Sequence, residues 1–452
     1  MGAMQSSDPS DSPDGRPRSD DVVGVVSPAL PERDPVPVPR GQTFAALHVR
    51  NYRYFFLGQA VSLAGTWMQS VALAWLVLQL TASATWLGLS VALQTLPVLL
   101  LGPYAGVLVD RVDKRRLLVG TQSAAGLLAL LLGLLTVSGR ITLVGVLVLS
   151  LAFGAVNSLD NPARQSFIRE MVPERLVRNA VTLNSVVVNA SRAVGPAVGG
   201  VLIATLGVGV CFLVNAASFL AVIAAYLLMH AADLRPTEPA PRAPGQLRAG
   251  LAYVRSEPDL LVPLLMMALV GTLTYEFQVS LPALATGTFG EGATSLGWIT
   301  SAMGLGAVVG GLVSASRSAT GIRPMTMSAT AFGLATALTA VAPSVQTAAA
   351  ALLLVGAASV WFLSVGNATL QIAAAPQMRG RVMALWAVAF LGTTPIGGPV
   401  VGWVAEHTGP RWALLVGASA AILAALLGAL VLRRRAQSPV GSVDRNSISP
   451  GK

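Results

Sequence analysis

Long apolar runs alternate with short polar breaks over most of the chain, from about residue 54 to residue 432. Many of these runs reach the roughly 20 residues that an α-helix needs to cross the hydrocarbon core of a bilayer. Several breaks are only two or three residues long, such as Ser138-Gly139-Arg140 and Leu206-Gly207, and indicate tight turns. We therefore predict an all-α integral membrane protein with twelve transmembrane helices, at 54–80, 86–109, 117–137, 141–167, 180–206, 208–229, 260–285, 295–314, 325–341, 347–373, 382–404 and 412–432.

The longest internal polar segment, rich in proline and arginine, divides these helices into two sets of six. We predict five parts: a disordered tail at 1–43, a six-helix bundle at 44–230, a linker at 231–257, a second six-helix bundle at 258–432 and a tail at 433–452. The first tail carries no apolar stretch typical of a signal peptide, so we expect the first span to act as an uncleaved insertion signal.

An internal repeat supports the division into two pseudo-symmetric bundles. Gly195, Pro196 and Gly199 in the fifth span recur as Gly398, Pro399 and Gly402 in the eleventh, always 203 positions later. Pro173 and Arg178 recur at the same offset as Pro376 and Arg381. Glycines four positions apart also occur in the second and eighth spans, so every third span is predicted to pack closely on a neighbour.

The charges fix the expected orientation. The chain has 30 Lys and Arg against 20 Asp and Glu, a net charge of +10. The basic residues gather in alternate loops, such as 111–116, 169–178 and 235–255, whereas the other loops hold only Arg140 and Arg411. Basic loops stay in the cytoplasm, so both termini are predicted to be cytoplasmic. One small cluster per loop is not the patch that binds nucleic acid, and no nucleic-acid partner is expected.

The composition argues against an enzyme. Apolar residues make up 54% of the chain and charged residues only 11%. The single cysteine, Cys211, lies in an apolar run, and the three histidines lie at span ends or in loops. No metal-binding cluster, phosphate-binding loop or dinucleotide motif is present. We expect no metal and no cofactor, and an ion gradient rather than ATP as the source of energy.

Glu276 is the sharpest functional candidate. It lies inside the seventh predicted span, where a charged side chain costs several kcal/mol unless it is paired, hydrated or protonated. We predict that it faces a central cavity and carries a proton during transport. The alternative is a structural acid that hydrogen-bonds to a nearby Tyr or Gln.

Two further charges inside spans join Glu276 as candidates for proton coupling. Arg192 lies in the middle of the fifth span, and Asp160 lies near the end of the fourth, four positions before Arg164. That spacing places Asp160 and Arg164 on one helix face. Asp160 is expected to pair with Arg164, which stabilises a helix end, or with Arg192. For Arg192 a gate, an anion contact and a structural ion pair all remain open.

Polar and aromatic residues within the spans are candidates for the wall of a substrate cavity, because the first, fourth, seventh and tenth helices of a two-bundle transporter face its centre. These residues are Trp67, Gln69, Asn157, Tyr275, Gln278, Trp361 and Asn367. Few charges line this predicted cavity, which favours an amphipathic or apolar substrate over a sugar phosphate.

The sequence also resembles a known family. Residues 106–116 hold Gly106, Asp110, Arg111 and a basic cluster, and resemble the loop between helices two and three of the major facilitator superfamily, although Asp113 replaces its usual glycine. Residues 195–200 resemble the Gly-Pro motif in the fifth helix of exporters of that superfamily, with Ser191 in place of its first glycine. Residues 65–69, 160–165 and 184–196 resemble the subfamily of the enterobactin exporter and macrolide efflux proteins, the transmembrane secretion effectors.

The resemblance implies alternating access, in which two six-helix halves rock about a central site. It also implies a conformational latch in which Asp110 meets the start of the eleventh span, near Val382 and Met383, where a carboxylate at a helix N-terminus gains roughly 0.3–1 kcal/mol. Arg111, Arg115 and Arg116 would hold neighbouring acids or lipid phosphates.

The sequence therefore predicts a monomeric proton-coupled exporter of drugs, siderophore-like compounds or other amphipathic small molecules, in the inner membrane of a bacterium. A lysophospholipid flippase is one alternative, and it would open sideways to the bilayer and need no proton gradient. A membrane receptor or scaffold without transport is another, and it would tolerate neutral residues at Glu276 and Asp110.

Overall fold

The computed structural model describes residues 44–235, 246–316 and 319–437, and every regular element in these ranges is helical. The α-helices are α1 (Arg50–Thr81), α2 (Ala84–Arg111), α3 (Lys114–Val137), α4 (Leu143–Met171), α5 (Glu174–Leu206), α6 (Val208–Leu227), α7 (Gln246–Ser256), α8 (Pro258–Leu273), α9 (Phe277–Ala283), α10 (Ala293–Ser316), α11 (Ile322–Ala340), α12 (Val345–Ala373), α13 (Arg379–Leu391), α14 (Thr394–His407) and α15 (Pro410–Gln437). Short 3₁₀ turns lie at Ala45–His48 and Ala231–Asp233, and a π-turn at Leu284–Thr288. The predicted all-α membrane fold is confirmed.

Eleven helical segments in the described residues are long and apolar enough to cross a membrane. The remaining predicted span, 325–341, corresponds to α11, which has 19 residues.

The polar residues that begin several helices cap them. Ser83 accepts from the Trp86 amide at the start of α2, and Thr142 accepts from the Gly145 amide at the start of α4.

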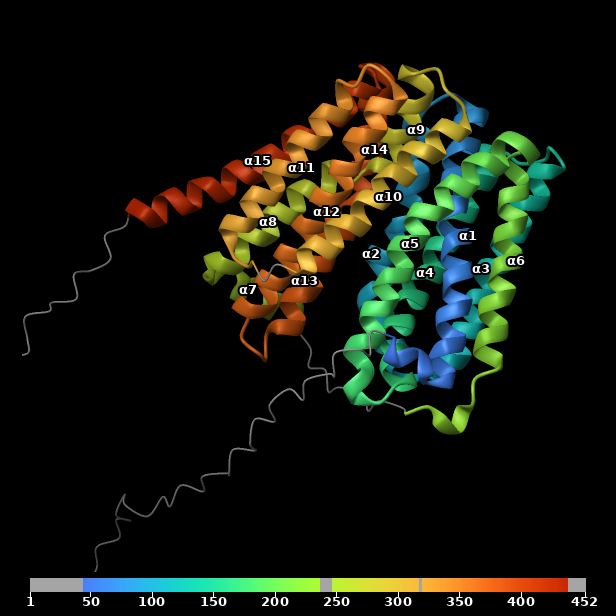
Figure 1. Cartoon of the computed structure of the whole chain (residues 1–452), viewed down its shortest axis with the longest axis horizontal. Helices are drawn as coiled ribbons and strands as arrows, with labels where there is room; N and C mark the ends of the chain where they lie inside the picture. Colours follow the sequence, from blue (N-terminus) through green and yellow to red (C-terminus); the bar gives the residue numbers. More distant parts are fainter. Residues whose placement is uncertain (1–43, 236–245, 317–318, 438–452) are drawn as a thin grey trace, which may run out of the picture. The chain divides into compact units, whose positions relative to one another are not determined.

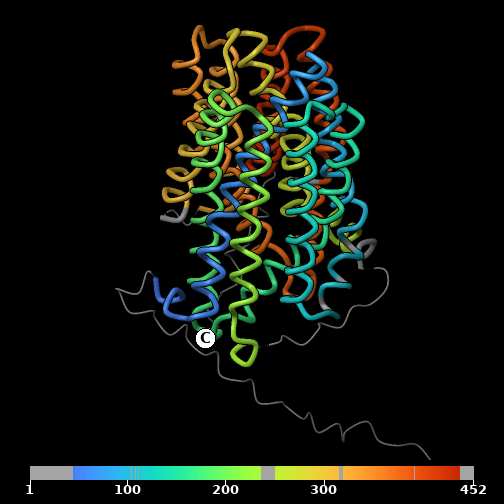
Figure 2. Tube along the Cα trace, turned by 90° about the vertical axis from the view of Figure 1, so that its right-hand side faces the viewer, coloured from blue at the N-terminus to red at the C-terminus, as the bar shows by residue number. Residues whose placement is uncertain are grey.

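Helices α1–α6 pack mainly on one another, through the pairs α2–α4, α3–α6, α1–α6 and α1–α5 (Figures 1 and 2). Helices α8–α15 form a second group, through α10–α12, α11–α15, α11–α12 and α8–α15. The contact of α5 with α1 in the first group corresponds to that of α13 and α14 with α8 in the second, as the repeat predicts.

The groups meet mainly through two helix pairs, α5 with α10 and α2 with α14 (Figure 1). Glycine allows the backbones to touch at both crossings. A Cβ atom added at Gly304 of α10 would lie 2.6 Å from the Ala193 Cα of α5, and one at Gly398 of α14 would lie 2.9 Å from the Gly88 carbonyl oxygen of α2. Both crossings lie away from the loops at 111–116 and 169–178. We call the end of the helices that carries these loops the basic end.

Two predicted spans are broken rather than continuous. The span at 260–285 divides into α8 and α9 around Thr274, Tyr275 and Glu276, and the span at 382–404 divides into α13 and α14 around Gly392 and Thr393. At the first break the Thr274 hydroxyl donates to the Gly417 carbonyl (2.7 Å), and the Tyr275 hydroxyl to the Ser359 carbonyl (2.8 Å). At the second break, proline follows Thr394 in the first turn of α14, where its missing amide hydrogen is tolerated.

The linker and the predicted C-terminal tail are helical in part. The predicted linker contains α7, which packs against α8 and α13, while residues 236–245 lie outside the described part. The predicted tail at 433–452 begins inside α15, and Arg435 of this helix pairs with Asp259 at 2.8 Å. The predicted tail at 1–43 and residues 438–452 lie outside the described residues.

Candidate functional site

A polar cavity of about 340 Å³ lies among α1–α6, with one wall residue from α9 of the second group. Four of the predicted wall residues line it: Trp67, Gln69, Asn157 and Gln278. Asp160 lines it as well. The cavity also receives polar side chains that the sequence did not single out, namely Gln59, Gln94, Gln122, Asn161 and Arg164. Glutamines inside apolar runs were the available signal for three of them.

Asp160 is held by neutral groups rather than by an arginine. The Thr121 hydroxyl and the Gln122 amide of α3 donate to its Oδ1 at 2.8 and 2.7 Å. Arg164 instead donates to the amide oxygens of Gln59 (3.1 Å) and Asn161 (2.8 Å). The expected ion pair of Asp160 with Arg164 or Arg192 is therefore wrong, because α3 supplies partners that the spacing on α4 alone does not reveal.

Arg192, on α5, is half-buried and lies over an aromatic ring. Its guanidinium carbon is 5.3 Å from the centroid of the Trp67 ring, within cation–π range. Its Nε is buried and has no hydrogen-bond partner in the described part of the chain. Tyr275 at the helix break is near enough to interact with it electrostatically.

Glu276 lies at the break between α8 and α9 and is only 2% exposed. Its carboxylate rests against α14: a Cβ atom added at Gly397 would lie 2.9 Å from Oε1, and one at Gly398 would lie 3.6 Å from Oε2. Thr394, in the first turn of α14, is placed to hydrogen-bond the carboxylate, while Oε1 has no partner among the described groups. A buried acid thus lies where two broken helices meet, next to the crossing of α14 with α2.

The other predicted wall residues lie outside the polar cavity. Tyr275 packs its ring edge-on against Phe332 and Phe390, each with a centroid distance of 5.1 Å. Asn367 accepts a short hydrogen bond from Gln371 on its own helix. These contacts of Tyr275 and Asn367 are made with residues of the second group.

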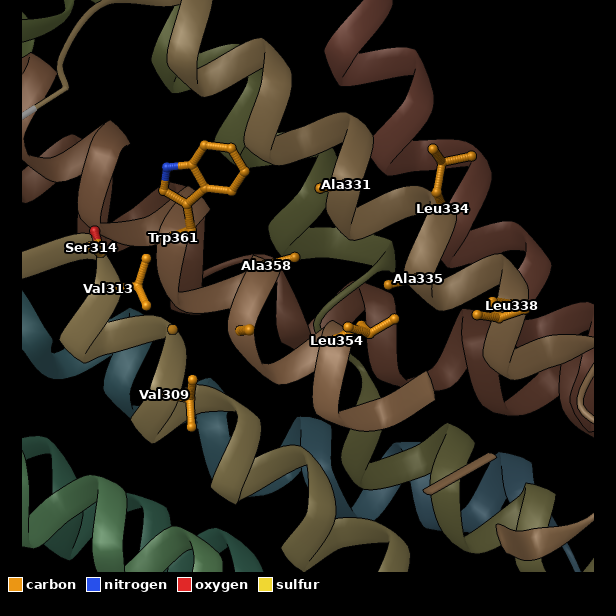
Figure 3. Close-up of a pocket in the computed structure, with 12 residues that line it drawn as sticks. Val309, Val313, Ser314, Ala331, Leu334, Ala335, Leu338, Leu354, Ala358 and Trp361 are labelled. Atoms are coloured by element: carbon orange, nitrogen blue, oxygen red, sulfur yellow. The ribbon is translucent and has the colours of Figure 1, made fainter. Parts of the chain in front are cut away.

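Trp361 lines a different hollow, an apolar groove of about 430 Å³ formed by α10, α11 and α12 (Figure 3). Apart from Ser314 and the indole of Trp361, aliphatic side chains and a glycine line this groove. Leu334 and Leu354 in its wall are 60% and 55% exposed, so the groove faces outward from the helix bundle.

The glycines of the Gly-Pro repeat lie in close helix contacts. A Cβ atom at Gly195, next to Pro196, would lie 2.7 Å from the Trp67 Cβ, and one at Gly199 would lie 3.1 Å from the Met68 Cγ. Gly398, Pro399 and Gly402 lie on the α14 side of the crossing with α2.

At the basic end, the loop between α2 and α3 is tied to its own group. Asp113 caps α3 by accepting from the Arg116 amide at 3.0 Å, which accounts for an acid where the superfamily signature has glycine. Arg115 donates to the last carbonyls of α6, those of Tyr226 (2.7 Å) and Leu227 (2.8 Å). Arg116 faces Asp113 at 3.8 Å. The predicted binding of Arg115 to an acid or a lipid is thus replaced by a helix cap.

The rest of the predicted latch is only partly described. Gly106 lies in α2, and Arg111 is its exposed last residue, but the side chain of Asp110 lies outside the described part. The sequence analysis did not identify the buried ion pair of Lys114, at the start of α3, with Glu170. The Lys114 ammonium is 2.7 Å from the Glu170 carboxylate, and both side chains are less than 9% exposed.

The opposite end holds a contact between the two groups that sequence analysis did not predict. The Oε2 of Glu406, near the end of α14, accepts from the Ser83 hydroxyl and, at 3.0 Å, from the Thr85 amide. Ser83 caps α2, so a carboxylate from the second group sits at the N-terminus of a helix in the first. No set of three or more His, Cys, Asp or Glu side chains in the described residues is arranged to hold a metal ion.

Sequence comparisons place these features in a known context. The sequence model of the transmembrane secretion effector family matches residues 41–448. The chain is 29% identical to the multidrug efflux pump Tap of Mycolicibacterium fortuitum over 76% of its own length and 87% of that protein. It is 25% identical to the enterobactin exporter EntS of Escherichia coli over 86% and 94% of the two chains.

A third relative is matched over a shorter stretch. The staphyloferrin A transporter of Staphylococcus aureus is 29% identical over 39% of this chain and 45% of that protein, so the match spans about half of that relative's length. Among solved structures, a bacterial homologue of the human lysosomal transporter Spinster has the same fold, with a TM-score of 0.68 over 85% of this chain and 97% of that one at 13% identity.

Proposed function

Because the chain belongs to the transmembrane secretion effector family of the major facilitator superfamily, and is therefore a multi-pass membrane transporter rather than an enzyme, we propose that it is a monomeric proton-coupled exporter of amphipathic small molecules. The relatives named as a multidrug efflux pump and an enterobactin exporter favour export of a drug-like or siderophore-like compound. No cofactor is needed, since a proton gradient supplies the energy.

The observation that carries the proposal is the position of Glu276. Broken helices that meet in the middle of a membrane are where transporters commonly place ion and substrate sites, since the break frees polar groups there. Glu276 occupies such a break, is shielded from solvent and touches the glycine pair of α14 that packs on α2. Its protonation removes a charge at the contact between the two groups, so proton binding and the separation of the groups are linked.

The contacts between the groups support an inward-facing state. They lie away from the basic end, whereas the polar cavity extends from the middle of α1 towards Arg164, near the basic end of α4. If the basic loops are cytoplasmic, as the distribution of positive charge favours, the cavity is closed to the outside and both termini are cytoplasmic. In the outward-facing state the contacts of α2 with α14 and of α5 with α10 would open.

Transport by protein in proteoliposomes with an imposed pH gradient tests the proposal. A panel of drugs and siderophores is compared for the wild type, Glu276→Gln and Glu257→Gln, the last an exposed acid at the start of α8. We expect Glu276→Gln to lose accumulation driven by the gradient while it keeps exchange without one, and Glu257→Gln to behave as the wild type. Full gradient-driven transport by Glu276→Gln would refute proton coupling at this residue, whereas no transport by any of the three proteins would favour a scaffold.

One observation favours a lysophospholipid flippase as the second candidate. The apolar groove of α10, α11 and α12 faces outward and suits an acyl chain (Figure 3). The same proteoliposomes, loaded with a fluorescent lysophospholipid and given no gradient, separate the candidates. Rapid redistribution between leaflets that survives Glu276→Gln would favour the flippase.

A further inference from the structure

Arg192 has a set of hydrogen-bond donors that the protein does not use. A guanidinium carries five N–H donors in a planar fork. Within the described residues, no hydrogen bond or ion pair engages any of them, and Nε is fully buried. Its contact with the Trp67 ring, 5.3 Å from the guanidinium carbon to the ring centroid, is not a hydrogen bond to an acceptor atom.

The acids nearby do not compensate this charge. Asp160, the acid that lines the polar cavity, receives its hydrogen bonds from Thr121 and Gln122. Glu276 rests on α14 instead. Keeping an arginine half-buried without a paired acid destabilises a fold, and a contact with an aromatic face offsets only part of this cost. Such an arrangement is expected where a ligand supplies the missing anion.

The unused fork lies beside the polar cavity. Trp67, on which it stacks, lines the cavity, and so does Val188, one helical turn before Arg192 on α5. The rest of the polar wall consists largely of neutral amides: Gln59, Gln69, Gln94, Gln122, Asn157, Asn161 and Gln278. These groups bind polar neutral parts of a molecule, and an aromatic side chain binds an apolar part. The wall also holds Asp160 and Arg164, whose hydrogen bonds join them to other protein groups, so the fork left unused is that of Arg192. Its geometry matches a carboxylate with two parallel hydrogen bonds.

We propose that Arg192 binds a carboxylate of the transported molecule, so that the substrates are amphipathic carboxylic acids rather than permanently cationic drugs. This inference rests on the proposed transport function and narrows its substrate class. Arg192 would orient the acid group while its apolar part lies towards Trp67.

Equilibrium binding by purified protein in lipid nanodiscs, without a pH gradient, tests the inference. The probes are radiolabelled 1-naphthaleneacetate, the uncharged 1-naphthaleneacetamide and the cationic 1-naphthylmethylammonium, which share one aromatic body. We expect the wild type to prefer the carboxylate over the amide by about tenfold or more, as a charge-assisted pair provides. Arg192→Gln should abolish this preference, and Arg140→Gln, which removes an exposed loop arginine, should retain it.

Arg192→Lys provides a second variant that keeps the charge but loses the fork. It should bind the carboxylate more weakly than the wild type and still better than the amide. The inference is overturned if the wild type shows no carboxylate preference, if it prefers the ammonium, or if Arg192→Gln retains the wild-type preference. Because no gradient is present, these results are independent of proton coupling at Glu276, which the transport assay decides.

Discussion

Replacing Glu406 by alanine is expected to shift the protein away from the conformation in which α2 and α14 meet. The carboxylate accepts from the Ser83 hydroxyl and the Thr85 amide, across the boundary between the two helix groups. An exposed charge at a helix N-terminus is worth roughly 0.3–1 kcal/mol, and Glu406 is exposed. A loss of about 1 kcal/mol changes the ratio of two conformations about fivefold. Glu406→Gln keeps an acceptor but no charge, and should fall between the wild type and alanine.

Distances between spin labels measure this ratio directly. Cysteines at Leu206, which is 61% exposed, and at Gly292, whose added Cβ meets no atom within 4 Å, place labels on either side of the crossing of α5 with α10. The native Cys211 is fully buried and should stay unlabelled. The alanine variant should populate a longer distance at the expense of the shorter one.

The control for Glu406 is Asp259→Asn, which removes an exposed acid whose partner, Arg435, lies in the same helix group. This control should leave the distance distribution unchanged. An unchanged distribution in Glu406→Ala, or an equal change in Asp259→Asn, would refute the reasoning that a contact between the groups holds this end closed.

Three further predictions concern the rest of the fold. Lys114→Met leaves the Glu170 carboxylate buried without its ammonium. It should lower the free energy of unfolding by about 3–5 kcal/mol, measured as a lower unfolding temperature, and replacing both residues by apolar ones should recover most of that stability. Asp113→Ala should cost about 0.5–2 kcal/mol and Asp113→Gly only a few tenths, measured by hydrogen exchange in the first turn of α3, and the reverse order would contradict capping. Gly306→Val would drive a side chain into the backbone of α12 and should abolish the folded yield in detergent, unlike Gly120→Val, whose added Cβ meets open space.

The membrane fold could be predicted because a bilayer constrains sequence strongly. A spanning segment must satisfy its own backbone hydrogen bonds, so each span appears as a long apolar helix bounded by polar residues. The break between α8 and α9 could not be predicted in the same way. Its Thr274 hydroxyl donates to the Gly417 carbonyl and its Tyr275 hydroxyl to the Ser359 carbonyl, which are 143 and 84 positions away. Residues 272–281 contain neither glycine nor proline.

The candidate site shows the same division between local and distant signals. Helical spacing placed Asp160 and Arg164 on one face of α4, but it does not encode the partners that α1 and α3 supply to them. Asp113 illustrates the reverse. Its departure from the family signature is explained by a purely local rule, because an acid at the N-cap accepts from the backbone three residues later.

The two groups of helices differ in structure, and the differences suit different roles in transport. In the first group α1 and α5 are continuous and carry Trp67 and Arg192, which meet beside the amide-lined cavity. Their counterparts in the second group are broken, and the break holds Glu276. Tyr275 precedes Glu276 and also lies near Arg192, so one residue separates the proposed anion site from the proposed proton site. A carboxylate at Arg192 and a charge on Glu276 would repel each other across Tyr275, so the protonation state of Glu276 would change the affinity for the acid, and this linkage is what coupled transport needs.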